Sequence, residues 1–229
     1  MRVLEVFAEY VSWLRLNVPL AYENLAGPAH PSELAALEDA IGHELPAAVK
    51  AVLGMHNGQA VPSLGYYEHG VPAIPSLTFM STTEIRTVWE FWDAISDDPS
   101  TIDLQEIGAT YPAAKGLIKP LWTSPGWIPL WAHPQRSDYI GVDLDPGPAG
   151  TSGQIINFGR DEERHFRGAP NFTDLIEFLL EEVTSGHWPA TVFVREGEDG
   201  EEEPTPWFGD HAKSFFNTLY DRYETRPRH

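Results

Sequence analysis

The chain contains no cysteine and few cationic residues, and each shortage excludes some classes of function. Without cysteine there is no disulfide, no thiol nucleophile and no cysteine-ligated zinc. Four lysines and eleven arginines face 34 acidic residues, which gives a formal net charge of −19 at pH 7. Such a charge repels nucleic-acid phosphates and anionic lipid surfaces and attracts basic proteins. We therefore expect a basic protein partner, and neither nucleic acid nor membrane.

The sequence also lacks a long apolar run. No stretch approaches the length that spans a membrane, and Glu5, Glu9 and Arg15 fall where a signal peptide would need its apolar centre. A cytoplasmic, soluble protein is the expectation. Two interpretations of the acidity stay open: it only keeps the protein soluble, or it steers a cationic partner.

The chain does have enough apolar material for a globular core. Hydrophobic residues make up 42% of its 229 residues and aromatic residues 12%, with eight tryptophans. No internal repeat emerges. We expect a single domain over 1–229, with a core at about 13–188 and an extension at 189–229 that holds an acidic loop and a C-terminal helix. A monomer or a weak dimer is expected.

Helical spacing of apolar residues predicts several helices before the middle of the chain. The first covers 3–16. Ser32 is the expected N-cap of a second helix, which Gly42 ends, and Pro46 opens a third. Serine is favoured at helix N-caps, glycine at helix C-caps and proline in the first helical turn.

Three later helices are expected, and start signals mark the first two of them. Ser81 and Glu84 match a capping box, in which each side chain accepts a hydrogen bond from the other residue's backbone N–H. Asn171 or Thr173 is expected to cap the next helix. A last helix is expected at about 210–223.

Three short strands are predicted in the middle of the chain, at 127–131, 138–147 and 153–160. Along the second strand, Ile140 and Val142 alternate with Tyr, Gly and Asp, which is typical of a half-buried strand.

The remaining segments complete the order of elements. Residues 96–126 have four prolines and weak periodicity, so they are expected to be irregular. A strand is predicted at Thr191–Arg195, and the run 196–203 is too charged and glycine-rich to pack. Helices first, strands in the middle and helices last, with loops too short for regular crossovers, predict an α+β fold.

No motif predicts catalysis or a metal. The nearest match to a nucleophile elbow, Gly150–Gln154, lacks the second glycine and is interpreted as a hairpin loop. Asp143, Asp145 and Gly147 begin like a calcium loop, but no glutamate closes it. The nine histidines include no His-Glu-x-x-His pair. We expect no catalytic residue, no metal and no cofactor.

Two segments together resemble a known family. Leu45-Pro46 and His56-Asn-Gly-Gln59, followed by the three strands in the same order, resemble the SUKH superfamily, and in particular its Smi/Knr type. That superfamily includes fungal cell-wall assembly regulators and bacterial immunity proteins that neutralise toxins. The resemblance covers about 13–188 and implies a small, mostly antiparallel sheet flanked by N-terminal and C-terminal helices.

The matching positions are expected to determine the fold rather than to catalyse. Gly58 and Gly159 suit turns, and Pro46 suits a helix start. Gly141 suits the close approach of a neighbouring strand or side chain. His56-Asn57 departs from the His-Asp form common in relatives, but Asn keeps the capacity to form a turn.

The first functional hypothesis is a non-catalytic immunity protein that binds and neutralises a basic toxin through an acidic face. The charge of −19 and the resemblance motivate it. Arginine outnumbers lysine, and this with abundant alanine favours a bacterial source. The carboxylates around the strand loops form the expected face, and they are Asp138, Asp143, Asp161, Glu162 and Glu163.

Aromatic residues could complete that face. Trp89 and Trp92 are interpreted as core, whereas Trp131 follows a strand beside a polar loop and is expected as an exposed anchor for a partner. Tyr139 is the second aromatic residue assigned to the partner-binding set.

Two other classes of function are considered. The chain could be a regulatory adaptor like the fungal Smi/Knr branch, which the close agreement over 127–167 favours. The third class is an enzyme acting on cell-wall glucan, which is supported only by the family's association with wall assembly. For glycoside hydrolysis, two carboxylates of the chain would need a partly apolar pocket that separates their pKa values.

Overall fold

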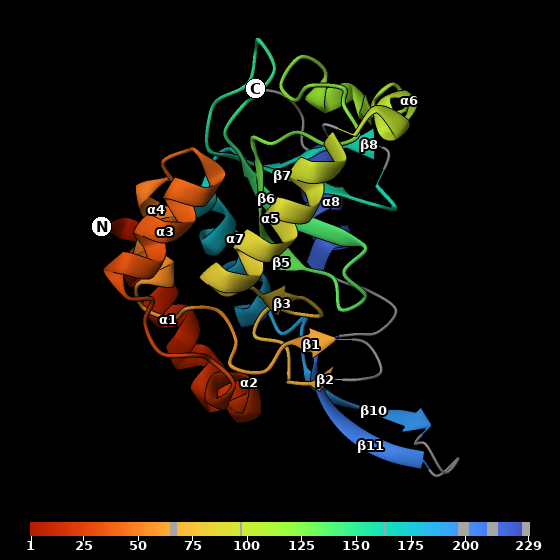
Figure 1. The fold of residues 1–229 in the computed structure, drawn as a ribbon. Helices are drawn as coiled ribbons and strands as arrows, with labels where there is room; N and C mark the ends of the chain where they lie inside the picture. The colour runs from red at the N-terminus through yellow and green to blue at the C-terminus, as the bar shows by residue number, and fades with distance from the viewer. Residues whose placement is uncertain (65–67, 97, 163, 197–201, 210–214, 226–229) are drawn as a thin grey trace.

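The protein is an α+β structure in which helices enclose a five-stranded sheet (Figure 1). The computed structural model describes residues 1–64, 68–96, 98–162, 164–196, 202–209 and 215–225. The sheet has the order β3-β5-β6-β7-β9 and is antiparallel throughout. Its strands are β3 (Thr78–Phe79), β5 (Trp127–Ala132), β6 (Asp138–Asp143), β7 (Gln154–Gly159) and β9 (Arg167–Ala169). The α+β prediction is confirmed.

Four helices precede the sheet, and apolar residues at helical spacing place them against it. They are α1 (Arg2–Asn17), α2 (Pro19–Glu23), α3 (Pro31–Ile41) and α4 (Ala47–Leu53). The predicted helix at 3–16 is confirmed as α1, and α2 is an additional short helix. Gly42 ends α3 with φ at 68°, as expected.

The predicted N-cap of α3 is wrong by two residues. His30, not Ser32, caps the helix: its Nδ1 accepts the Ser32 N–H at 3.2 Å, and the Glu33 carboxylate accepts the His30 N–H at 2.6 Å. Pro31 then occupies the first helical position, where a missing N–H costs nothing. A histidine nitrogen therefore takes the role that a serine hydroxyl usually fills.

Helix α5 (Thr82–Ser96) covers one face of the sheet, and α7 (Phe172–Thr184) and α8 (Phe215–Thr225) cover the other. The capping box of α5 is confirmed, because the Ser81 N–H donates to Glu84 at 2.9 Å and the Glu84 N–H donates to the Ser81 hydroxyl at 3.3 Å. Asn171 caps α7 by accepting the Asp174 N–H at 3.1 Å.

The central strands are buried on both faces, so the prediction of a half-buried strand is wrong. Every residue of β5 and β7 is buried, and so is all of β6 after its first residue. The reason lies on the α5 side, where Trp92 packs on the Tyr139 ring that the alternation left facing outward, and Trp122 packs on Trp92.

A bulge in β5 divides its two tryptophans between these faces. The register with β6 shifts between Pro129 and Trp131, so Leu130 is an extra residue. Trp127 consequently packs on the α5 side and Trp131 on the α7 side. Without the bulge, residues four apart on a strand would share a face.

The segment at 96–126 holds only short elements, as expected: η1 (Pro99–Thr101), α6 (Ile102–Gln105), β4 (Ala109–Thr110) and η2 (Pro112–Ala114). Strand β4 pairs in parallel with β8 (Arg164–His165). Two further strands, β1 (Ser63–Leu64) and β2 (Glu68–His69), form a separate pair.

After α7 the chain forms an antiparallel ribbon of β10 (Ala190–Glu196) and β11 (Glu202–Phe208). The strand at 191–195 is confirmed, but β11 was not predicted, because Pro204, Pro206 and acidic residues are rare in strands. Phe215 of α8 packs against Trp131 and Phe178, so the C-terminal helix contributes to the main core. The single-domain interpretation stays a prediction.

Glycine at position 141 is required by sterics, as the sequence predicted. A Cβ atom on Gly141 would lie 2.3 Å from the Ile128 carbonyl oxygen and 2.7 Å from the Phe158 ring. Gly58, with φ at 74°, is equally constrained by the backbone of Met80. Both positions lie where two segments meet closely.

We expect Gly141→Ala to lower the free energy of unfolding by about 3 kcal/mol, because strand backbone must move apart to admit the methyl group. Gly27→Ala is the matched control: nothing lies within 4 Å of a Cβ there, and its φ is ordinary. The control should be neutral or slightly stabilising. Urea denaturation of both variants measures the difference, and equal stabilities would contradict the steric argument.

Candidate functional site

Three of the predicted partner-binding carboxylates come together at one end of the main sheet, where β6 begins and β7 ends. Asp138 is the first residue of β6 and pairs with Gly159. In the turn after β7, the Asp161 N–H donates to the Asp138 carboxylate at 3.3 Å, and Glu162 forms a bridge with Gly159. We call Asp138, Asp161 and Glu162 the acidic end.

The local backbone explains why these carboxylates meet. The Arg160 N–H donates to the Ser137 carbonyl at 2.7 Å, which draws the two chain segments together. A Cβ on Gly159 would lie 2.3 Å from that same carbonyl oxygen, so only glycine fits. The tight approach then places Asp161 beside Asp138.

Burial and mutual repulsion raise two of the three pKa values. Burial raises the pKa of Glu162 to about 7, and the nearby Asp138 adds to the increase, while a hydrogen bond from Asn157 at 2.9 Å opposes it. Burial also raises the pKa of Asp138, against a 2.6 Å hydrogen bond from the Ser137 hydroxyl. The exposed Asp161 differs: its two hydrogen bonds from Arg160 lower its pKa.

This arrangement suits a cation that arrives from outside. Arg160 is exposed and pairs with Asp161, and among the described residues neither Asp138 nor Glu162 forms an ion pair. An incoming ammonium or guanidinium group would stabilise both carboxylates in the charged form and lower their pKa values. The role of the acidic end in binding stays a prediction.

The other predicted site residues are not available to a partner. Trp131 is only 1% exposed and lies between Phe172 and Phe215, so the expectation of an exposed anchor is wrong. Tyr139 is 4% exposed, with its ring against Trp92. The β5 bulge explains the burial of Trp131, and the packing of α5 on the sheet explains the burial of Tyr139. Neither feature is visible in a sequence pattern.

Asp143 is also misplaced in the predicted face. It lies at the far end of β6, about 17 Å from Asp138 along the strand, and is fully buried. Its carboxylate accepts the Asp145 N–H at 3.0 Å and a Gln154 amide hydrogen at 2.8 Å, so it braces the β6–β7 loop. Burial raises its pKa to about 6. Glu163 lies outside the described residues.

An ion pair fixes the turn that carries Asp138. Arg136, in this β5–β6 turn, has φ at 52°, and its guanidinium pairs with the Glu84 carboxylate. The other oxygen of Glu84 accepts the Ser81 N–H in the α5 capping box. One half-buried carboxylate therefore ties the start of α5 to the acidic end.

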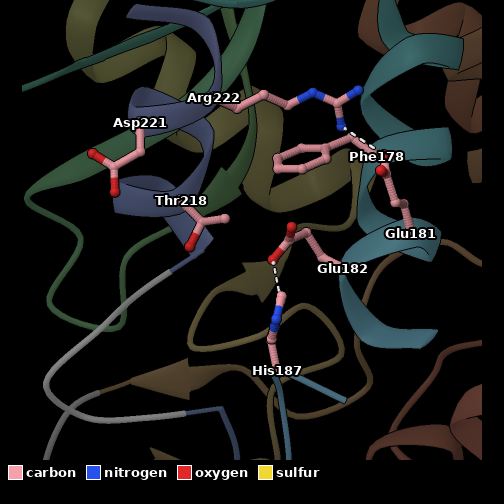
Figure 2. A pocket seen from close by; sticks show the side chains of 7 residues that line it. All are labelled: Phe178, Glu181, Glu182, His187, Thr218, Asp221 and Arg222. Carbon is pink, nitrogen blue, oxygen red and sulfur yellow. Dashed lines mark hydrogen bonds and ion pairs between the residues drawn. The ribbon is translucent and has the colours of Figure 1, made fainter. Parts of the chain in front are cut away.

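A hollow lies between α7 and α8, apart from the acidic end (Figure 2). It was not predicted from the sequence. Its volume is about 400 Å³. Its lining combines three carboxylates with one arginine and one histidine: Phe178, Glu181, Glu182, His187, Thr218, Asp221 and Arg222. Only the packing of α8 on α7 brings these charges together, so no local signal predicts them.

Within this hollow, Arg222 is held by Glu181 and Phe178. Its guanidinium lies 3.1 Å from the Glu181 carboxylate and stacks 3.9 Å from the centre of the Phe178 ring (Figure 2). His187 lies 3.3 Å from Glu182. Thr218 has a buried hydroxyl with no hydrogen-bond partner in the described chain. The open, charged lining suits a polar group rather than an apolar ligand.

The described residues offer neither a metal site nor a membrane-spanning helix. No group of three or more His, Asp or Glu side chains there is placed to hold a metal ion. None of the helices in that part of the chain has the length and apolar character needed to cross a membrane.

Comparison with known proteins identifies the family. The sequence profile of the SMI1 / KNR4 family (SUKH-1) matches residues 28–177, which is more than half of the chain. The chain belongs to the SMI1/KNR4 family. This confirms the resemblance that the sequence motifs indicated.

Fungal relatives show the same relationship. The "Cell wall biosynthesis/cell cycle regulator smi1" of Schizosaccharomyces pombe is 28% identical over 184 residues, which cover 77% of this chain and 35% of the relative. The "Glucan synthesis regulatory protein" of Neurospora crassa is 25% identical, with 77% and 37% covered. The "Cell wall assembly regulator SMI1" of Saccharomyces cerevisiae is 38% identical over 71 residues, with 31% and 14% covered. The chain thus spans about a third of the first two relatives.

The residues that carried the SMI1/KNR4 resemblance hold segments together. Asn57 accepts the Thr82 N–H at 2.8 Å and so supports the start of α5. The side chain of Gln59 accepts the backbone N–H groups of Ala73 and Phe79 at 2.9 and 2.8 Å. In this SMI1/KNR4 chain, Asn57 and Gln59 therefore have structural roles. The hollow at α7–α8 and the β10–β11 ribbon lie mostly or wholly beyond the matched region.

Replacing Glu162 with Gln should increase stability at neutral and alkaline pH. Because the folded pKa of Glu162 is raised, the folded state binds more protons than the unfolded state between about pH 4.5 and pH 7, and the free energy of unfolding falls as pH rises through that window. Glu162→Gln removes this loss and keeps an acceptor for Asn157. Denaturation from about pH 4 to pH 8 measures it.

The gain of Glu162→Gln should be absent near pH 4 and complete above pH 7, with a residual slope below about pH 6 from Asp143. Glu23→Gln, at an exposed position of α2, is the control and should leave the wild-type curve unchanged. A gain that does not depend on pH would contradict the assignment of the titration to Glu162.

Replacing Glu84 with Ala should cost about 2–3 kcal/mol, because it removes half of the capping box and leaves Arg136 half-buried without its partner. Glu90→Ala on the same helix removes an exposed pair with Arg86 and should cost under about 0.5 kcal/mol. Thermal and urea unfolding compare them. Equal costs would show that Glu84 does not join the two segments.

Proposed function

We propose that this chain is a non-catalytic, protein-binding regulatory domain that recruits partner proteins, as an adaptor in cell-wall assembly or signalling. The observation that carries the proposal is membership of the SMI1/KNR4 family, whose relatives are named as regulators of cell-wall biosynthesis, cell-wall assembly and glucan synthesis. A domain about a third as long as such relatives supplies one function among several. Binding is the function that this fold supports best.

The acidic end is the proposed docking surface for a basic segment of the partner. Asp161 is exposed, and Asp138 and Glu162 are partly exposed beside it. A chain of charge −19 attracts basic proteins over long range, and these three carboxylates give the attraction a local target. Glucan catalysis has less support, since the Neurospora crassa relative is named a regulatory protein.

A bacterial immunity function is the second candidate. The strongly acidic composition favours it, because a toxin that attacks nucleic acid is basic and would bind such a surface. The fungal relatives favour the adaptor instead, so the immunity hypothesis takes second place. Both functions require a protein partner and differ in which partner is held.

The experiment uses the full chain as bait in lysate of its source organism at about 50 mM and about 200 mM salt, followed by mass spectrometry of the retained proteins. Several kinases or wall-synthesis factors are expected under the adaptor proposal. A single basic, toxic protein held stoichiometrically would establish the immunity function instead. An empty bait would overturn both.

Charge reversal at the acidic end should weaken the identified complex. Asp161→Lys should reduce affinity roughly five-fold at low salt, equivalent to about 1 kcal/mol, and less at high salt. Affinity should also increase as pH rises through about 7, because Glu162 becomes ionised. Asp39→Lys, at an exposed position of α3, carries the same charge change elsewhere. Equal losses in both variants would show that net charge acts without a local docking surface.

A further inference from the structure

The two edges of the β10–β11 ribbon are chemically different. In an antiparallel pair, residues that face each other alternate between those that exchange backbone hydrogen bonds and those whose N–H and C=O groups point outward. The Gly209 N–H donates to the Pro189 carbonyl at 3.2 Å, which fixes Pro189 and Gly209 as a bonded pair. Counting along the register from there assigns every position of the ribbon.

On β11, the outward-pointing positions include both prolines. Pro206 faces Val192 and Pro204 faces Val194, and these are the pairs that do not exchange hydrogen bonds. Because proline has no N–H, the outer edge of β11 lacks two of the donors that another strand would need. Phe208, also outward-pointing, gives its carbonyl to the Ser76 N–H at 2.9 Å. The outer edge of β11 is therefore blocked at both prolines, and at Phe208 it is joined to the body of the protein.

On β10, the outward-pointing positions keep their donors. They are Ala190, Val192, Val194 and Glu196. Within the described chain, β10 has no strand neighbour except β11. Figure 1 shows the ribbon extending away from the main sheet and its helices. The β10 edge therefore offers alternating N–H and C=O groups to an incoming strand.

The ribbon face beside this edge is apolar and exposed. Val192 is 63% exposed, and Ala190, Pro204 and Pro206 on the same face are exposed as well. On the opposite face, Trp207 and Thr205 are buried. An added strand could lay alternate side chains beside Val192 while its backbone pairs with β10.

Charge indicates the kind of strand that fits. Three glutamates, Glu196, Glu202 and Glu203, lie together at the end of the ribbon far from Pro189 and Gly209. A cationic segment would be attracted there, whereas a second copy of this chain, which also carries −19, would be repelled. Exposed edges are normally blocked, as β11 is, and an unblocked edge beside an apolar face is the kind of feature with which an added strand pairs.

We propose that β10 receives an extended segment of a partner protein, alternating apolar with Lys or Arg residues, as an added strand. The proposal rests on the protein-binding function above and names a second surface for it, distinct from the acidic end. Backbone pairing supplies the affinity, and the glutamates at positions 196, 202 and 203 select a basic sequence.

The test measures binding of a fluorescein-labelled, end-blocked peptide of alternating valine and lysine to the full chain by anisotropy. Val192→Pro should weaken binding at least ten-fold, because it removes an outward N–H at a position whose partner is already proline. Val192→Thr keeps that N–H and should bind within about three-fold of wild type. Slower exchange of the Val192 amide hydrogen on binding is expected as well.

A second peptide separates pairing from charge. The same sequence, N-methylated on two adjacent central residues so that both its edges are blocked, keeps its charge and should bind at least ten-fold more weakly. Equal binding of both peptides, equal binding by Val192→Pro, or no binding of either peptide would overturn the proposal. Loss on Asp161→Lys alone would place the peptide at the acidic end and would leave the proposed function intact.

Self-association is the remaining outcome. A concentration-dependent dimer in sedimentation that Val192→Pro abolishes would show that β10 pairs with a second copy, and would overturn the proposed occupant. Partners retained from lysate equally by wild type and Val192→Pro would place protein binding elsewhere on the domain. That result separates failure of this inference from failure of the function.

Discussion

The extra residue in β5 is the constraint on which the rest of the fold depends. By shifting the register between Pro129 and Trp131, it directs Trp127 to the α5 side of the sheet and Trp131 to the α7 and α8 side. Each indole then organises its own layer of aromatic rings. Truncating a buried tryptophan costs about 3–5 kcal/mol. Because the bulge places one tryptophan in each layer, the stability of both layers depends on it.

Burial of both sheet faces leaves only ends, edges and attached elements for binding. The acidic end lies where β6 begins and β7 ends, and the charged hollow lies between α7 and α8. The β10–β11 ribbon follows residue 177, where the match to the family profile ends. A fold with a closed core and binding features at its margins suits a scaffold whose partners differ, because a change at a margin leaves the core intact.

The electrostatics of the acidic end illustrate a compromise between stability and binding. Holding Asp138 and Glu162 half-buried beside each other raises their pKa values and costs stability at neutral pH. An arriving cation would recover that cost, which is the electrostatic reason for proposing this end as a docking surface for a charged partner. The Glu84–Arg136 ion pair fixes the β5–β6 turn that precedes Asp138.

Sequence by itself determined the α+β class, the central strands, the capping box of α5 and the need for glycine at position 141, because each follows from local backbone preference or from strand period. It also indicated the family. Tertiary structure decided which carboxylates meet, that Asp143 and Trp131 are buried, and that the α7–α8 hollow and the β10 edge exist. A bulge of one residue and the packing of distant helices decide these, and neither leaves a periodic signal in the chain.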